Sequence, residues 1–299
     1  MYILVNMKKA MRYAVFPLLA AIIVLIASGS GAAARLASAQ QDSRKVAIIM
    51  YHSILKDSAR QGKYVVSPAV LEADLKYLTE NGYTTVTVSD LADYVFRGKE
   101  LPEKPVMLTF DDGYYNNYLY AFPLMKKYNC KMVLSVVGTY SDQFSETKDE
   151  NAYYSHCTWD EINEMMESGL VEIQNHSYNM HSYGSSRHGS RKRDSETKQQ
   201  YTEVFTADVE KMQQRVKEMT GYTPTAFTYP YGAVCAEAEE LIRQMGFIAS
   251  FTCEEKITVI STDPESLYTL HRWLRPAGTD SKTYFEQTVK LGKYFGGIR

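Results

Sequence analysis

Short apolar segments alternate with amphipathic segments along most of this chain, and this alternation restricts the possible folds more than any other feature. The apolar, strand-like segments are 46–52, 83–88, 105–110, 131–138, 171–176, 225–232 and 247–252. The helix-like segments are 67–82, 89–98, 116–128, 158–169, 197–219 and 236–246. Strands that are apolar throughout indicate parallel strands covered by helices. About seven such units in roughly 250 residues predict an α/β fold, with a closed (β/α) barrel favoured over an open, doubly wound sheet.

Several classes of partner are disfavoured by the sequence. Neither G-x-G-x-x-G nor G-x-x-x-x-G-K-[ST] occurs, which weakens a nucleotide-binding interpretation, and a net charge of −2 gives no reason to expect nucleic acid. The basic segment 185–198 is interpreted as a solvated surface loop, with contact to an anionic cell-surface polymer as the alternative. A structural zinc site is not expected, because no C-x-x-C pair occurs among Cys130, Cys157, Cys235 and Cys253. Whether any of these cysteines form a disulfide stays open.

The amino-terminal segment has the pattern of an export signal. Lys8, Lys9 and Arg12 precede the uncharged stretch 13–34, and the small residues Ala-Ser-Ala at 37–39 offer a cleavage site before Gln40. The uncharged stretch also approaches the ~20 residues needed to cross a bilayer, so an uncleaved membrane anchor is the alternative. Either reading predicts that the rest of the chain is extracellular or lies on the outer face of the cytoplasmic membrane. We therefore expect a signal peptide or anchor at 1–39 and one domain at 40–299.

Two adjacent aspartates, Asp111 and Asp112, follow the apolar strand 105–110. In α/β barrels the working residues lie at the carboxyl ends of the strands, and neighbouring side chains there point in different directions. One carboxylate could then bind a cation while the other stays free as a base, because the cation removes the repulsion between them. The alternative is a simple Asp-Asp-Gly turn.

A second polar cluster follows strand 171–176, where His176 ends the strand and His181 lies five positions later. On a helix these two side chains would point about 140° apart, so one ligand at the strand end and one from the following loop is easier. Two histidines with one aspartate are common ligands for a divalent metal, and they leave a position open for water. Two loop histidines without a metal are the alternative.

The third cluster is a tight turn in the sequence FTYPYGAVC (227–235). Pro230 stiffens this turn and Gly232 allows close backbone approach, which exposes a backbone N–H near Tyr231. Such a donor could stabilise an oxyanion. Taken alone, this sequence is ordinary turn chemistry.

The three clusters, in this order on successive strand ends, resemble those of the polysaccharide deacetylases, the NodB-homology family of carbohydrate esterases (family 4). The matching motifs are TFDDG (109–113), HSYNMH (176–181) and YPYG (229–232), within a similarity that covers roughly 45–280. The surrounding sequence is similar to the branch with poly-N-acetylglucosamine deacetylases and exported Gram-positive proteins. The resemblance implies a distorted (β/α) barrel of about seven parallel strands. It also implies hydrolysis of N-acetyl groups on a polysaccharide such as peptidoglycan, poly-N-acetylglucosamine or a chitin-like oligomer.

The resemblance also implies roles for individual residues. Asp112, His176 and His181 would hold a divalent metal, most simply Zn²⁺. Asp111 would be the catalytic base, and the Tyr231 backbone N–H would share the oxyanion with the metal.

Two motifs of the family are altered in this chain. The histidine motif that supplies the catalytic acid has an imperfect counterpart in LYTLHRWLRP (267–276), where His271 is the nearest candidate. The arginine that often precedes the prolines of the third motif is replaced by Thr228 and Tyr229, and Arg272 could orient Asp111 instead. These changes support the competing hypothesis of a catalytically silent carbohydrate-binding or envelope scaffold protein that keeps the fold.

Overall fold

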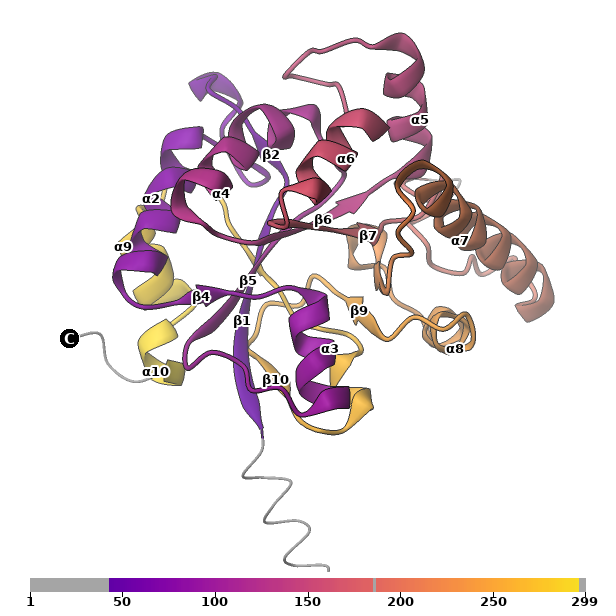
Figure 1. The fold of residues 1–299 in the computed structure, drawn as a ribbon. Helices are drawn as coiled ribbons and strands as arrows, with labels where there is room; N and C mark the ends of the chain where they lie inside the picture. The colour runs from indigo at the N-terminus through magenta and orange to yellow at the C-terminus, as the bar shows by residue number, and fades with distance from the viewer. Residues whose placement is uncertain (1–42, 185–186, 296–299) are drawn as a thin grey trace, which may run out of the picture. The chain divides into compact units, whose positions relative to one another are not determined.

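The computed structural model describes residues 43–184 and 187–295, so the predicted signal or anchor at 1–39 lies outside the described residues. These residues form an α/β barrel of parallel strands surrounded by helices (Figure 1). Among the described residues, no helix has the length and apolar character needed to cross a membrane.

Strand β1 (Arg44–Tyr51) lies second in the sheet, which has the order β10-β1-β5-β6-β7-β8-β9. The strands that follow β1 pair in parallel, and they are β5 (Pro105–Phe110), β6 (Met132–Val136), β7 (Val171–Asn175), β8 (Ala226–Thr228) and β9 (Ala249–Phe251). On the other edge, β1 pairs in parallel with β11 (Trp273–Leu274) and antiparallel with β10 (Thr258–Ile260). A parallel bridge from Phe251 to Leu270 connects β9 with the chain that leads into β11. This arrangement confirms the predicted distorted barrel.

Helices surround the sheet and follow the strands in the predicted alternation. The main ones are α2 (Pro68–Glu80), α3 (Val88–Arg97), α4 (Phe122–Tyr128), α5 (Gly138–Thr147), α6 (Trp159–Glu167), α7 (Lys198–Thr220) and α8 (Ala236–Gln244). Short helices α9 (Ser281–Thr283) and α10 (Leu291–Phe295) end the described chain. The first turn of α2 illustrates the local cause, because Ser67 accepts a hydrogen bond from the Val70 N–H at 3.1 Å and Pro68 occupies the first helical position.

The structure differs from the sequence prediction in two places. The strand predicted at 83–88 shrinks to β4 (Thr84–Thr85), because Thr87 caps α3 and Val88 already begins that helix. The sequence predicts no element where helix α5 lies, since GTYSDQFSET is largely polar and buries just Gly138, Ser141 and Phe144.

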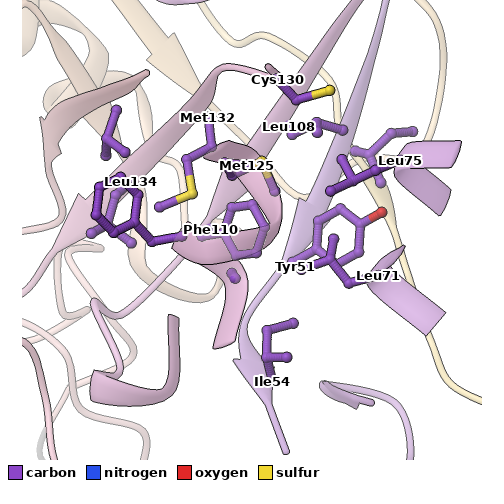
Figure 2. Packing of buried hydrophobic residues seen from close by; sticks show 14 of the residues in the cluster. Tyr51, Ile54, Leu71, Leu75, Leu108, Phe110, Met125, Cys130, Met132 and Leu134 are labelled. Carbon is purple, nitrogen blue, oxygen red and sulfur yellow. The ribbon is translucent and has the colours of Figure 1, made fainter. Parts of the chain in front are cut away.

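Side-chain alternation along the strands separates two apolar layers. Leu108 and Phe110 of β5 face the outer helices, where Tyr51 stacks on Phe110 with ring centroids 4.9 Å apart. Figure 2 shows these residues against Leu71 and Leu75 of α2 and Met125 of α4. Met107 faces the inner layer instead. Since side chains alternate, Asp111 continues the inward-facing series of Met107 and Thr109.

Both tryptophans contribute to the core. Trp159 is buried there, and Trp273 is partly buried and packs against the same core. All four cysteines are free, so the structure contains no disulfide.

Candidate active site

A cavity of about 530 Å³ lies where the strands end, and it is lined by residues from all three sequence clusters. The cavity brings together Asp111, Asp112, His176, His181 and Tyr231. These residues come from β5, β7 and the turn after β8, which are successive neighbours or near neighbours in the sheet. Their convergence follows from parallel strands that end at one edge.

Asp111 is buried and held by a guanidinium group. Its backbone N–H donates to the Tyr51 carbonyl at 3.0 Å, which fixes the end of β5 against β1. Arg272 donates to both carboxylate oxygens, at 2.7 Å to Oδ1 and 2.8 Å to Oδ2. Burial alone would raise the pKa of Asp111, but the Arg272 charge and the nearby His176 outweigh it and hold that pKa below its ordinary value. Arg272 therefore favours the ionised form of Asp111.

Arg272 reaches Asp111 from the segment before β11, as the sequence analysis suggested in place of the usual third-motif arginine. Its side chain is fully buried, and its Nε donates to the Thr252 carbonyl at 2.8 Å. A bidentate pair of this kind fixes the orientation of the carboxylate as well as its charge.

Asp112 turns away from its neighbour because the backbone changes direction. Its φ is 70°, a conformation that few residues other than glycine adopt. Nδ1 of His156 donates to the Asp112 carbonyl at 2.8 Å, and the His156 ring packs against Tyr114 and Tyr140 with centroids 4.8 and 4.4 Å away. The next residue, Gly113, also has positive φ, and a Cβ there would lie 2.9 Å from Cγ1 of Val136. These contacts hold the unusual turn in place.

The two histidines converge on Asp112. Nε2 of His176 and Nε2 of His181 lie 3.3 and 3.0 Å from Oδ1 of Asp112, and one ligand atom from each of the three residues fits within 4.8 Å of the others. Nδ1 of His176 lies 2.7 Å from the Thr228 carbonyl and so donates to it, which leaves Nε2 with the lone pair. Such an outer hydrogen bond is characteristic of metal-binding histidines.

Charge at this cluster is strongly perturbed. Burial would raise the pKa of Asp112, but the adjacent His176 and His181 hold that pKa well below its ordinary value. Burial would lower the pKa of His181, yet Asp112 raises it above the ordinary value. A buried carboxylate that stabilises positive charge on its neighbours can equally stabilise a cation.

The loop between the two histidines is fixed on both sides. The carboxylate of Asp208 on α7 accepts hydrogen bonds from the Tyr178 and Asn179 N–H groups, each at 2.8 Å. On the other side, the Gly138 N–H at the start of α5 donates to the Ser177 carbonyl at 3.1 Å. A loop with five-residue spacing between its histidines is thus held by contacts beyond the cluster itself.

Tyr231 adopts a φ of 59° within the turn Pro230–Gly232. Among the described residues, no acceptor is found for its backbone N–H. Its hydroxyl lies 3.3 Å from Nδ1 of His181, and its ring is 44% exposed over the cavity. The role of this N–H as an oxyanion donor stays a prediction.

His271 does not join this group. It is not among the described residues that line the cavity, and its buried Nδ1 is 3.3 Å from Oε2 of Glu254, whose side chain is exposed. The position of His271 therefore argues against the prediction that this residue supplies the catalytic proton. The late motif does contribute to the site, but through the next residue, Arg272, because side chains on adjacent residues point in opposite directions.

Three other histidines occupy positions that the sequence did not reveal. His52 lines the cavity. His156 supports the Asp112 backbone through a hydrogen bond to the Asp112 carbonyl. His188 also lines the cavity. A position at the end of strand 46–52 was the available signal for His52; the other two carry no comparable pattern.

The strand ends of this barrel hold an Asp-His-His cluster and, beside it, a separate ionised aspartate. These features define a class of barrel proteins with a candidate metal site. Comparison with known proteins narrows this class. A sequence model of the polysaccharide deacetylase family matches residues 98–250, just over half of the chain, and the protein belongs to this family.

Individual relatives agree with this assignment. The chain is 28% identical over 226 residues to the poly-β-1,6-N-acetyl-D-glucosamine N-deacetylase of Escherichia coli K12, which covers 69% of this chain and 33% of that protein. It thus spans about a third of that relative's length. It is 27% identical over 228 residues to the putative polysaccharide deacetylase YxkH of Bacillus subtilis 168, covering 76% and 70% respectively. The solved de-N-acetylase of Aggregatibacter actinomycetemcomitans superposes with a TM-score of 0.69 at 26% identity, covering 81% of this chain and 99% of that one.

Proposed function

We propose that this protein is a metal-dependent hydrolase that removes N-acetyl groups from an N-acetylglucosamine-containing cell-surface polysaccharide, giving acetate and free amine. The observation that carries the proposal is the convergence of Asp112, His176 and His181 beside a separately held Asp111. The printed name of the Escherichia coli relative, a poly-β-1,6-N-acetyl-D-glucosamine N-deacetylase, supports an N-acetylglucosamine polymer as substrate.

The donor set fits a divalent metal such as Zn²⁺. Two imidazole nitrogens and one carboxylate oxygen are suitable ligands, and Oδ1 of Asp112 is buried with no partner of hydrogen-bond geometry among the described residues. When bound, the ion would act as a Lewis acid toward the acetamido carbonyl and lower the pKa of a bound water toward ~7.

The protein's own groups have separate tasks in this proposal. Asp111, kept ionised by Arg272, accepts the proton of the attacking water. The Tyr231 N–H donates to the oxygen that gains negative charge. The Arg272 pair keeps Asp111 from rotating toward Asp112, so that the two carboxylates do different work.

A group in the cavity must also protonate the departing amine, and His52 is the best placed. It lines the cavity, and its buried Nδ1 has no hydrogen-bond partner among the described residues. We therefore assign the proton donation to His52 instead of His271.

Substitution of the two histidines separates these assignments. His52→Gln is expected to lower kcat for acetamido substrates by about 10²- to 10⁴-fold, the usual contribution of general acid catalysis. His271→Gln, the matched control, should stay within a few-fold of the parent because its ring lies outside the cavity. Steady-state acetate release from both variants is the measurement. Greater loss in His271→Gln than in His52→Gln would reverse the assignment.

The proposal as a whole is tested by acetate release from peptidoglycan, poly-N-acetylglucosamine and chitin oligomers, before and after treatment with a chelator. We expect release from at least one polymer, loss of activity after chelation, and recovery when Zn²⁺ or another divalent ion is restored. Oligosaccharide binding without acetate release under any of these conditions would favour the silent carbohydrate-binding protein.

The proposal places the reaction outside the cytoplasmic membrane. Its support is the amino-terminal pattern of basic residues followed by the uncharged stretch 13–34. Polysaccharides of the cell surface would then be within reach of the domain.

A further inference from the structure

A wall of exposed aromatic rings extends outward from the metal-type cluster along one side of the cavity. The Tyr231 ring centroid lies 4.6 Å from that of His181 and 5.5 Å from that of Tyr183. His188 completes the wall, with its centroid 4.7 Å from Tyr183 and 5.9 Å from Tyr231. All four residues line the same cavity, yet Tyr183 is 73% exposed. A large ring left this exposed beside a polar cleft is unusual for a side chain whose only task is packing.

The backbone that carries these rings is docked on the protein. The Gly189 N–H donates to the Ser182 carbonyl at 2.8 Å, and Tyr201 donates through its hydroxyl to the Ser190 carbonyl at 2.6 Å. Gly189 has a φ of 54°, and a Cβ there would collide with the Pro230 carbonyl. Gly189 is thus seated against the turn that bears Tyr231.

One charge of the basic segment is satisfied within the protein. Arg187 is buried, pairs with Glu196 and donates to the Arg191 carbonyl at 2.9 Å. The solvated loop predicted from the sequence holds for residues 191–198, which are mostly exposed, whereas Arg187, Gly189 and Ser190 are buried. The segment presents the His188 ring to the cavity while its nearest arginine faces inward.

We propose that Tyr183, His188 and Tyr231 form a binding subsite for a second sugar unit, next to the unit whose acetamido group enters the Asp-His-His cluster. This inference rests on the proposed function and names the feature of the substrate that the site would recognise. Aromatic rings offer a rigid apolar face with a polar edge, which suits the C–H face and hydroxyl rim of a pyranose. Two ring-to-ring steps separate His181 from Tyr183, a span that a neighbouring unit of the same polymer can bridge.

The subsite makes binding depend on chain length. A single N-acetylglucosamine can occupy only the position at the cluster, whereas an oligomer can also cover the exposed Tyr183 ring. Removing that ring should therefore weaken the binding of oligomers more than that of the monomer. The difference between the loss of oligomer affinity and the loss of monomer affinity measures the contribution of the subsite separately from that of the Asp-His-His cluster.

The experiment measures affinity directly, by calorimetric titration of Asp111→Asn protein loaded with Zn²⁺, so that substrate is not consumed. The ligands are the N-acetylglucosamine monomer, trimer and pentamer in β-1,4 and β-1,6 linkage. Adding Tyr183→Ala should weaken pentamer binding about three- to tenfold and reduce the advantage of pentamer over monomer. Tyr183→Phe should keep the advantage because the ring remains. Tyr154→Ala is the matched control, since Tyr154 is 54% exposed but lies outside the described cavity lining.

The outcomes separate this inference from the proposed function. Equal pentamer affinity with and without Tyr183→Ala, or no oligomer binding by the parent, would overturn the subsite. An equal loss for Tyr154→Ala would also overturn it, since the effect would then not belong to the cavity. Tyr183-dependent binding without acetate release by the wild-type protein would leave the subsite standing and remove the deacetylase.

Discussion

Asp111→Asn is expected to abolish acetate release, with kcat falling by at least about 10²- to 10⁴-fold, while the protein still binds its metal. An amide cannot take a proton from water at neutral pH, so the variant loses the base directly. The three candidate metal ligands are unchanged, because Asp111 is held by Arg272 and not by either histidine of the cluster. Metal content by mass spectrometry and acetate release, measured on the same preparation, give the two quantities.

The variant also places an amide NH₂ against the buried Arg272 guanidinium and leaves that charge uncompensated, which should cost about 3–5 kcal/mol of stability. Asp74→Asn is a matched control for that cost. Asp74 is fully buried and pairs bidentately with Arg275, yet neither residue is among the described residues that line the cavity. We expect Asp74→Asn to lose stability but retain turnover. Turnover retained in Asp111→Asn would refute its role as base, and loss of metal there would make Asp111 a ligand.

The fold was largely accessible from the sequence because the strands are apolar and regularly spaced. The predicted strand 105–110 agrees with β5 residue for residue, and it places Asp111 at the strand end where the cavity forms. Local rules failed where structure depends on partners distant in sequence. The strand predicted at 83–88 was overridden by the cap of α3 at Thr87, and the polar helix α5 has too few apolar residues to show a helical period.

Part of the candidate site could be predicted from the sequence for the same reason. Strand ends bring Asp112, His176 and His181 together, and each lies next to an apolar run that the sequence displays. The supporting contacts have no such signal. Arg272 is 161 positions from Asp111, and the strand that follows it, β11, has only two residues. His156 acts through a hydrogen bond to the Asp112 carbonyl. This contact depends on backbone geometry, which residue patterns in the sequence do not reveal.

Replacing Arg272 by methionine should cause the second large effect, on both stability and pH dependence. Removal of one partner from a buried ion pair leaves an uncompensated charge and typically costs about 3–5 kcal/mol. Burial is the largest influence on Asp111 and acts to raise its pKa, so without the guanidinium the pKa of Asp111 should rise above its value in the wild type. Asp111 would then be protonated over a wider pH range, and the acidic limb of the rate profile should shift to higher pH.

The stability of the metal-free protein should change its pH dependence accordingly. In the wild type the pKa of Asp111 is lowered by folding, so this group contributes stability above its unfolded pKa that is lost as pH falls through the folded pKa. In Arg272→Met, if the folded pKa exceeds the unfolded one, the sign reverses and acidification favours the folded state. Thermal unfolding of chelator-treated protein across pH measures this slope, with the wild type as reference.

Arg275→Met distinguishes the effect on Asp111 from a general loss of packing. Arg275 is as buried as Arg272 and also pairs bidentately with an aspartate, Asp74, at 2.8 and 3.0 Å. Its loss should therefore reduce the free energy of unfolding by a comparable amount while leaving the acidic limb of the rate profile in place. A shift of equal size in both variants would mean that the acidic limb of the rate profile reports global stability. Arg272 would then have no specific effect on the pKa of Asp111. A shift confined to Arg272→Met would tie the ionisation of Asp111 to this one contact, because the two arginines differ in which carboxylate they hold and not in how deeply they are buried.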